Sequence, residues 1–194
     1  DFMRFRQTSD GKSVFMSVDS RSIPGNPLYN AFKAKSFTAG DVTFHFYILD
    51  LLKANGITDV CVTLMYLGEK IKEELSSVND MNISFFTEHE PLGTAGSVAN
   101  CRSFLGGDDD FIVISGDCIC DFNLKRAVAY HKEKGCKATV LLTRVDDPLE
   151  YGVAVTSADG AVTGFVEKPS WSKVYSDTVN TGIYILSKDI FDYF

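Results

Sequence analysis

Strand and helix patterns alternate from about Ile48 to Val145, and this alternation restricts the fold more than any other feature of the sequence. Short apolar runs rich in β-branched residues predict buried strands, and segments with apolar residues three to four positions apart predict helices. Such an order is typical of a parallel sheet covered by helices. The sequence therefore predicts an α/β fold with a mostly parallel sheet and helices on both faces. Strands are expected at 59–66, 82–88, 110–117 and 137–145, and helices at 48–56, 68–75, 93–105 and 121–135.

The alternation of strand and helix patterns ends after Val145. The segment 151–169 predicts a hairpin, because Asp159-Gly160 is a turn signal between two apolar runs. A further strand is expected at 179–187, followed by the beginning of a helix. We expect a single domain over 1–194, in which 1–40 has no assigned layout.

Composition excludes several classes of partner. The net charge is −7 and no run of four basic residues occurs, so nucleic acid and anionic membrane surfaces are poor partners. No apolar stretch reaches the ~18 residues of a membrane helix. The five cysteines are odd in number and form no C-x-x-C pair. This usage predicts a reduced, cytoplasmic protein without a zinc site.

Two candidate site segments follow predicted strands. Ligands of parallel sheets bind beyond the carboxyl ends of strands, where the loop 90–96 and the triplet 115–117 fall. Asp117 is therefore a candidate ligand for Mg²⁺, which prefers one or two carboxylates together with phosphate oxygens. Gly93 and Gly96 precede or open a helix, where backbone N–H groups suit a phosphate or a flat base. An equally open alternative is that these glycines and Asp117 form ordinary turns.

The "VEKP" segment is a sharper candidate. Glu167 and Lys168 follow an apolar run, and such a pair could hold sugar hydroxyls and a phosphate. The alternative is an exposed surface pair. Two other features are assigned structural places: Asp108-Asp109-Asp110 is expected to be a solvated turn, and His131 is expected on the surface of its helix.

Five segments, in this order and spacing, resemble the sugar-1-phosphate nucleotidyltransferases, and most closely their mannose-1-phosphate guanylyltransferase-like (GDP-mannose pyrophosphorylase) branch. They are "EPLGTAGSV", "FIVISGD", "EYGVAV", "FVEKPSW" and "VNTGIYIL". The resemblance covers about Ile48 to Phe194 and implies a Rossmann-like sheet. It also implies a reaction, in which a sugar 1-phosphate oxygen attacks the α-phosphorus of a nucleoside triphosphate and pyrophosphate leaves. Mg²⁺ would neutralise the phosphates.

The resemblance also implies roles for individual residues. Leu92, Gly93, Thr94 and Gly96 would lie along the nucleobase. Asp117 would bind the metal and, with Lys168, act in catalysis, since Lys168 would hold the sugar phosphate. The sugar itself would be bound by Tyr151, Gly152, Glu167, Asn180, Thr181 and Gly182.

The chain departs from the family pattern in two respects. The family's glycine-rich loop, G-x-G-T-R-L, and its Pro-Lys-Pro stretch have no match here. Its second metal carboxylate is expected beyond Phe194, so the C-terminal part of the family domain is absent from the chain. We therefore expect an incomplete catalytic domain with little turnover of its own. The alternative is a non-catalytic, nucleotide-sugar-binding or regulatory relative. The base, the sugar and a homo-oligomeric state stay open.

Overall fold

The computed structural model describes residues 4–8, 13–16, 36–39, 42–45, 47–65, 68–107, 109–116 and 120–194, with side chains from Ile48 onward. The strands are β1 (Arg4–Thr8), β2 (Ser13–Met16), β3 (Ser36–Ala39), β4 (Val42–His45), β5 (Asp59–Leu64), β6 (Asn82–Thr87), β7 (Phe111–Ser115), β8 (Ala138–Arg144), β9 (Gly152–Thr156), β10 (Val162–Glu167) and β11 (Thr178–Leu186). The helices are α2 (Tyr47–Ala54), α3 (Gly68–Leu75), α4 (Gly93–Asn100), α5 (Arg102–Leu105), α6 (Leu124–Lys134) and the 3₁₀ helices η2 (Trp171–Lys173) and η3 (Lys188–Tyr193). The chain divides into two compact units, Asp1–Thr139 with Tyr184–Phe194, and Val140–Ile183.

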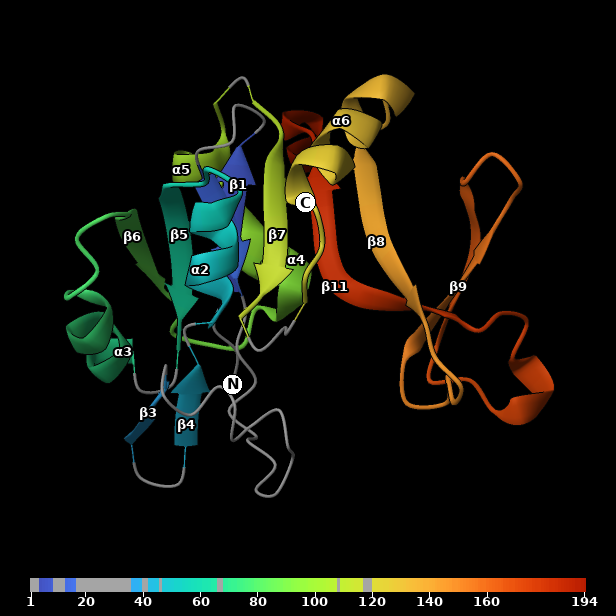
Figure 1. Cartoon of the computed structure of the whole chain (residues 1–194), viewed down its shortest axis with the longest axis horizontal. Coiled ribbons are helices and arrows are strands. Elements are labelled where there is room, and N and C mark those ends of the chain that lie inside the picture. The colour runs from blue at the N-terminus through green and yellow to red at the C-terminus, as the bar shows by residue number, and fades with distance from the viewer. Residues whose placement is uncertain are drawn as a thin grey trace. The chain divides into compact units, whose positions relative to one another are not determined.

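The first unit is built on a sheet whose strands follow the order β11-β7-β1-β2-β5-β6 (Figure 1). Parallel pairs join β6 to β5, β5 to β2, and β2 to β7, so three of the four expected strands run in one direction. The fourth, β8, pairs with β11 instead. The strand β1 and the end of β11 run antiparallel to β7. The mostly parallel α/β sheet is thus confirmed, and two of its strands come from the segment for which no layout could be derived.

Helices cover both faces of this sheet. Every residue of β5 after Asp59 is buried, as are the first four of β7, which is expected when both faces are covered. On one face Val98, Cys101 and Leu105 of the α4–α5 segment pack in one cluster with Cys61 and with residues of β7. In Figure 1 these two helices lie behind the sheet and α2 lies in front of it.

Local signals set the ends of α2 and α6, and the glycine after each of these helices is as expected. After α2 the chain reaches Gly56, which has a left-handed φ of 79°. The helix α6 starts at Asn123, whose side-chain oxygen accepts a hydrogen bond from the N–H of Arg126 at 2.9 Å. It ends at Gly135, with a φ of 59° and an N–H that donates to the carbonyl of His131.

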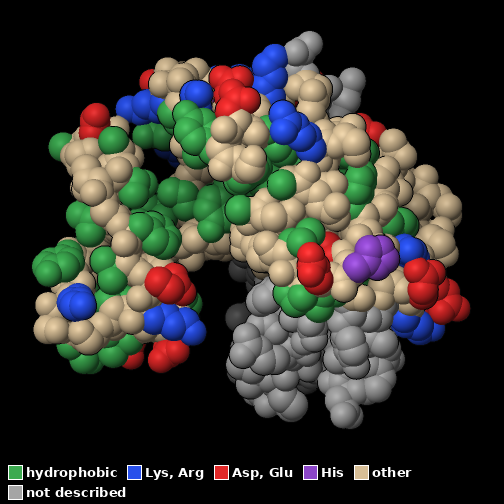
Figure 2. Space-filling model, turned by 180° about the vertical axis from the view of Figure 1, so that it is seen from behind, with side chains coloured by type: hydrophobic (Ala, Val, Ile, Leu, Met, Phe, Trp, Pro, Cys, Tyr) green, Lys and Arg blue, Asp and Glu red, His purple; other side chains and the backbone are tan. Residues whose placement is uncertain are grey.

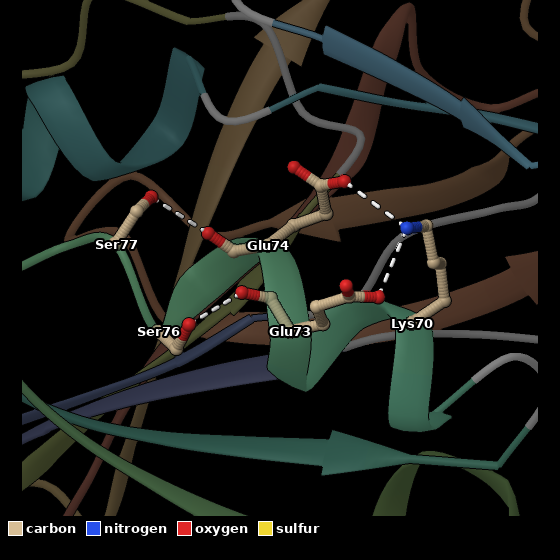
Figure 3. A network of polar contacts seen from close by, with 5 residues as sticks. All are labelled: Lys70, Glu73, Glu74, Ser76 and Ser77. Carbon is tan, nitrogen blue, oxygen red and sulfur yellow. Dashed lines mark hydrogen bonds and ion pairs between the residues drawn. The ribbon is translucent and has the colours of Figure 1, made fainter.

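The helix α3 shows which interactions hold a surface helix. Lys70 Nζ lies 2.9 Å from Glu73 and 3.5 Å from Glu74, and two serine hydroxyls donate to carbonyls of the last turn (Figure 3). Exposed pairs of this spacing contribute only ~0.3–0.5 kcal/mol each. The buried side chains of Ile71 and Leu75 therefore anchor the helix, as their four-residue spacing predicts.

The second unit contains the expected hairpin. β9 and β10 pair antiparallel, and Gly160, with a φ of 89°, lies in the turn between them. β9 also pairs antiparallel with β11, and β8 pairs with β11 as well. The hairpin predicted for 151–169 is confirmed.

Two smaller expectations need correction. His131 does not lie on the helix surface: its side chain is only 2% exposed. Its Nδ1 forms a hydrogen bond with the Thr139 hydroxyl. This bond satisfies a ring nitrogen that would otherwise be buried without a partner. Of the expected acidic turn, Asp108 lies outside the described residues, and Asp110 is not fully solvated, because its carboxylate faces this ring. Within the described ranges, no helix combines the length and the apolar character needed to span a bilayer.

Candidate functional site

The glycine loop of the first unit has a conformation that requires glycine. Gly93 has a φ of 68°, in the left-handed region that other residues rarely adopt. A side chain at Gly96 would place its Cβ 2.9 Å from the Cβ of Leu92. Gly93 is therefore needed for its backbone conformation, and Gly96 for the close approach of the Leu92 side chain. Because Leu92 makes no side-chain cap, the first-turn N–H groups of α4 are not satisfied by that residue. The exposed segment 91–95 can thus present backbone donors to a ligand.

The expected metal ligand, Asp117, lies outside the described residues. Its neighbour Gly116 is buried directly after β7. Since β6 and β7 run in the same direction, the glycine loop and the end of β7 follow the same edge of the first unit's sheet. Among the described residues, no three His, Cys, Asp or Glu side chains are grouped so that they could hold a metal ion. The metal role of Asp117 stays a prediction.

The second unit places three expected sugar-side residues in one row. Glu167 of β10 pairs with Gly152 of β9. Val179 of β11 pairs with Val153, the residue after Gly152, and the two strands are antiparallel. This register puts Asn180 opposite Gly152. The sheet therefore carries Glu167, Gly152 and Asn180 side by side on one face.

Because Gly152 has no side chain, the side chains of Glu167 and Phe165 can lie close to its backbone. A Cβ on this residue would lie 2.9 Å from Glu167 Oε2 and 2.8 Å from a ring carbon of Phe165. Any larger residue would push the carboxylate or the ring away from the backbone. The glycine thus allows the carboxylate of Glu167 to lie over the middle strand of the row.

Lys168 has the most unusual backbone of this region. Its φ of 41° is the only positive value of a non-glycine residue within the described ranges. Its N–H donates to the carbonyl of Tyr151 at 3.0 Å, which fixes the lysine directly after the row. Strained conformations of this kind cost about 1–3 kcal/mol and cluster at ligand sites. The side chains of Tyr151 and Lys168 are both exposed to solvent.

The three consecutive residues from β11 divide into different roles. Gly182 has a φ of 74°, and its N–H donates to Asn180 Oδ1 at 2.9 Å, which stabilises a bend in the strand. The Thr181 hydroxyl donates to the carbonyl of Leu141 at 2.7 Å. Thr181 and Gly182 therefore shape the strand, whereas Asn180 stands in the row. The second unit thus brings together Tyr151, Gly152, Glu167, Lys168 and Asn180.

One residue of this region was missed by the sequence reasoning. Phe165 is 49% exposed and lies against Gly152, beside the Glu167 carboxylate. The signal was available, because residues two apart on a strand share a face. Other large apolar side chains of this unit are also exposed, and Figure 2 shows hydrophobic side chains over it at left. They are Tyr151, Val162, Trp171 and Tyr175.

The arrangement in the second unit has a clear chemical character. A carboxylate accepts hydrogen bonds from hydroxyl groups, an amide both donates to them and accepts from them, and the adjacent ammonium can neutralise a phosphate. An exposed aromatic ring beside them offers an apolar surface. Together these groups suit a polyhydroxylated ligand that carries a phosphate.

Comparisons with known proteins point to one family. The family model described as "Nucleotidyl transferase" matches residues 26–194. The chain is 36% identical over 150 residues to a mannose-1-phosphate guanyltransferase from Schizosaccharomyces pombe, covering 74% of this chain and 41% of that protein. It is 37% identical over 147 residues to the catalytic subunit beta of mannose-1-phosphate guanylyltransferase from Xenopus tropicalis, covering 73% and 40%. The chain thus spans about two fifths of the length of these relatives.

A solved structure shares the fold. The crystal structure of HddC from Yersinia pseudotuberculosis, complexed with GMP-PN, superposes with a TM-score of 0.66 at 27% identity. The match covers 77% of this chain and 64% of that one. The match extends the similarity from sequence to three-dimensional structure.

Proposed function

Because the chain belongs to the nucleotidyl transferase family, we propose that it is a domain that joins a nucleoside triphosphate and a sugar 1-phosphate. The products would be a nucleotide sugar and pyrophosphate. Mannose 1-phosphate or glucose 1-phosphate is the expected sugar substrate, and the similarity to mannose-1-phosphate guanylyltransferases supports this choice. Both units would belong to this one domain.

The single observation that carries the proposal is the row in the second unit. Glu167 and Asn180 flank a position without a side chain, and Lys168 follows Glu167 directly. We propose that the carboxylate and amide bind sugar hydroxyls while the ammonium binds the sugar phosphate. Tyr151 and Gly152 would complete the sugar side, with Thr181 and Gly182 holding the strand that carries Asn180.

The first unit would bind the nucleotide. We propose that Leu92, Gly93, Thr94 and Gly96 lie along the base, because residues 91–95 are exposed and no bulky side chain stands between Gly93 and Gly96. Asp117 would hold Mg²⁺, whose charge would offset the crowded phosphates. The chain's own contribution is then mainly to position two anionic substrates for in-line attack.

Titration calorimetry with mannose 1-phosphate and glucose 1-phosphate tests the sugar side. A hydrogen bond to a charged group contributes about 1.5–3 kcal/mol, so Lys168→Ala should weaken binding roughly 10- to 150-fold. Lys173→Ala is the matched control, because Lys173 is exposed in the same unit but lies outside the row. Equal affinities of the two variants, with a parent protein that binds, would show that "VEKP" is only a surface turn.

A non-catalytic relative is the second candidate function. The observation that favours it is the missing G-x-G-T-R-L segment, which supplies the triphosphate cradle in the resembling family. Such a protein would bind nucleotide sugars without releasing pyrophosphate. A pyrophosphate-release assay with several triphosphates separates the two candidates. A cytoplasmic location and a homo-oligomeric state stay predictions.

A further inference from the structure

Four polar side chains meet in the first unit, between α6 and the starts of β7 and β8. The sulfur of Cys136 lies 3.2 Å from Thr139 Oγ1 and 3.8 Å from His131 Nδ1. The Thr139 hydroxyl lies 2.7 Å from the same ring nitrogen. On the far side of the ring, Nε2 lies 3.9 Å from Asp110 Oδ2. A thiol, a hydroxyl, an imidazole and a carboxylate are therefore aligned.

We propose that Cys136 is a modification site, a nucleophilic thiol that exchanges with small anionic disulfides. His131 accepts the thiol proton through the hydroxyl of Thr139. The arrangement follows the general pattern of an activated nucleophile, in which a base within hydrogen-bond reach is oriented by a third group. None of these four residues belongs to the nucleotide-side or sugar-side residues described above.

The imidazole is in the neutral form that can accept a proton. Its ring is buried, and burial lowers the pKa of His131, with Lys132 acting in the same direction and Asp110 opposing both. The ring is therefore neutral near neutral pH, so that one nitrogen has a lone pair. In the tautomer with its proton on Nε2, the nitrogen that faces Asp110, the lone pair is on Nδ1 and faces Thr139. The carboxylate also stabilises the imidazolium that forms.

The exchange balances without a further oxidant. The Thr139 hydroxyl passes its proton to His131 Nδ1 while it takes the proton of the Cys136 thiol. The thiolate sulfur attacks one sulfur of the disulfide, a new S–S bond forms, and the old S–S bond breaks. The leaving thiolate departs with the electron pair and can take the proton held by the imidazolium.

Accessibility singles out this thiol among the described cysteines. Cys61 and Cys101 are fully buried and Cys120 is half-buried, whereas Cys136 is exposed. Two cations flank it in sequence. Lys134 Nζ lies 5.3 Å from the centre of the Tyr130 ring, and Lys137 Nζ lies 5.0 Å from that of Tyr193. Asp189 and Asp192 also act on Lys137, and we infer that the ammonium groups next to the thiol in sequence favour a disulfide that carries negative charge.

The test uses the 194-residue chain and two disulfide probes. The anionic probe is 5,5′-dithiobis(2-nitrobenzoate), whose released thiolate is coloured, and the cationic probe is cystamine. Peptide mapping by mass spectrometry identifies the modified cysteine. We expect the fastest phase of the reaction with the anionic probe to modify Cys136 in the parent, and this phase to be absent in Cys136→Ser. The anionic probe should react faster than cystamine relative to a free cysteine peptide, and salt should reduce this preference.

Two variants of Thr139 test the relay. Thr139→Val removes the hydroxyl at nearly constant volume, and we expect the rate at pH 7 to fall about tenfold, at the low end of general-base effects. Thr139→Ser keeps the hydroxyl, and its rate should be within about twofold of the rate of the parent. Both proteins should react faster than Thr139→Val only at a pH where the thiol proton has to be removed by the relay. The rates should converge above about pH 9, where an ordinary thiol ionises without help. A purely structural role of Thr139 would not produce this convergence.

Three results would overturn the inference. The first is that Thr139→Val and the parent react at equal rates at pH 7, while circular dichroism shows that both proteins are folded. The second is a fast phase that maps to another cysteine. The third is a Cys136 that reacts no faster than a cysteine in a short peptide of the same local sequence. If Thr139→Val does not fold, the peptide comparison decides alone.

Discussion

Replacing Lys168 should separate the stability of the protein from its affinity for a sugar phosphate. The residue has a φ of 41°, so its backbone is strained for any residue except glycine. Lys168→Gly relieves the strain and also removes the ammonium. Lys168→Ala removes the same ammonium but keeps the strained backbone. The two variants should therefore lose affinity equally and differ in stability.

The expected difference follows from two opposing terms. A left-handed conformation costs a non-glycine residue roughly 1–2 kcal/mol. Glycine gains freedom in the unfolded chain, which costs about 0.4–1 kcal/mol. The free energy of unfolding of Lys168→Gly should therefore be higher than that of Lys168→Ala by about 0.8 kcal/mol, which corresponds to ~2–3 °C in Tm for a chain of this size. Both variants should bind sugar 1-phosphate roughly 10- to 150-fold more weakly than the parent.

Urea unfolding followed by fluorescence and calorimetric titration measure the two quantities. Lys173→Gly and Lys173→Ala form the control pair, because the backbone of Lys173 in η2 lacks a positive φ. There glycine should be the less stable of the two, and affinity should not change. If Lys168→Gly is also less stable than Lys168→Ala, the strain does not exist in solution. If both Lys168 variants bind as the parent does, the phosphate role is wrong.

Three further outcomes are expected. The chain as given should release little or no pyrophosphate, since each missing electrostatic donor typically costs ~10²–10³ in rate; robust turnover in a phosphate-coupled assay would show that the cradle comes from unrecognised residues. Gly152→Ala should weaken sugar-phosphate binding in calorimetry by displacing Glu167, whereas Gly164→Ala, whose Cβ would make an ordinary contact, should not. Burial lowers the folded-state pKa of His131, so the free energy of unfolding should fall as the pH drops below 6.5 and through that pKa. The urea midpoint should therefore fall less between high and low pH in His131→Gln than in the parent.

The sheet could be predicted because its core strands carry a local signal. The continuous apolar runs of β5 and β7 are the pattern of strands covered on both faces, and the glycines after α2 and α6 mark where each helix ends. The strands β1 and β2 carry no comparable signal. Their places in the sheet depend on pairing with strands far away in the chain, which no local pattern encodes.

The residues proposed for the site could be selected from the sequence, whereas their arrangement could not. The segments with Glu167, Lys168 and Asn180 stand out by motif, but a motif does not reveal register. The row arises because Gly152 pairs with Glu167 on one side and, through Val153 and Val179, brings Asn180 to the other. The positive φ of Lys168 could not be foreseen at all, because lysine is not a residue that favours it.

The thiol cluster shows a different limit of sequence patterns. His131 and Cys136 lie among lysines near the end of a helix, so composition alone predicts a solvated surface. What buries the ring is the turn at Gly135, whose left-handed φ reverses the chain and brings Thr139 back beside the helix. The same reversal keeps Cys136 at the surface, within reach of the Thr139 hydroxyl. A buried base and an exposed nucleophile can therefore arise only five residues apart, and only the tertiary structure distinguishes them from an ordinary polar helix end.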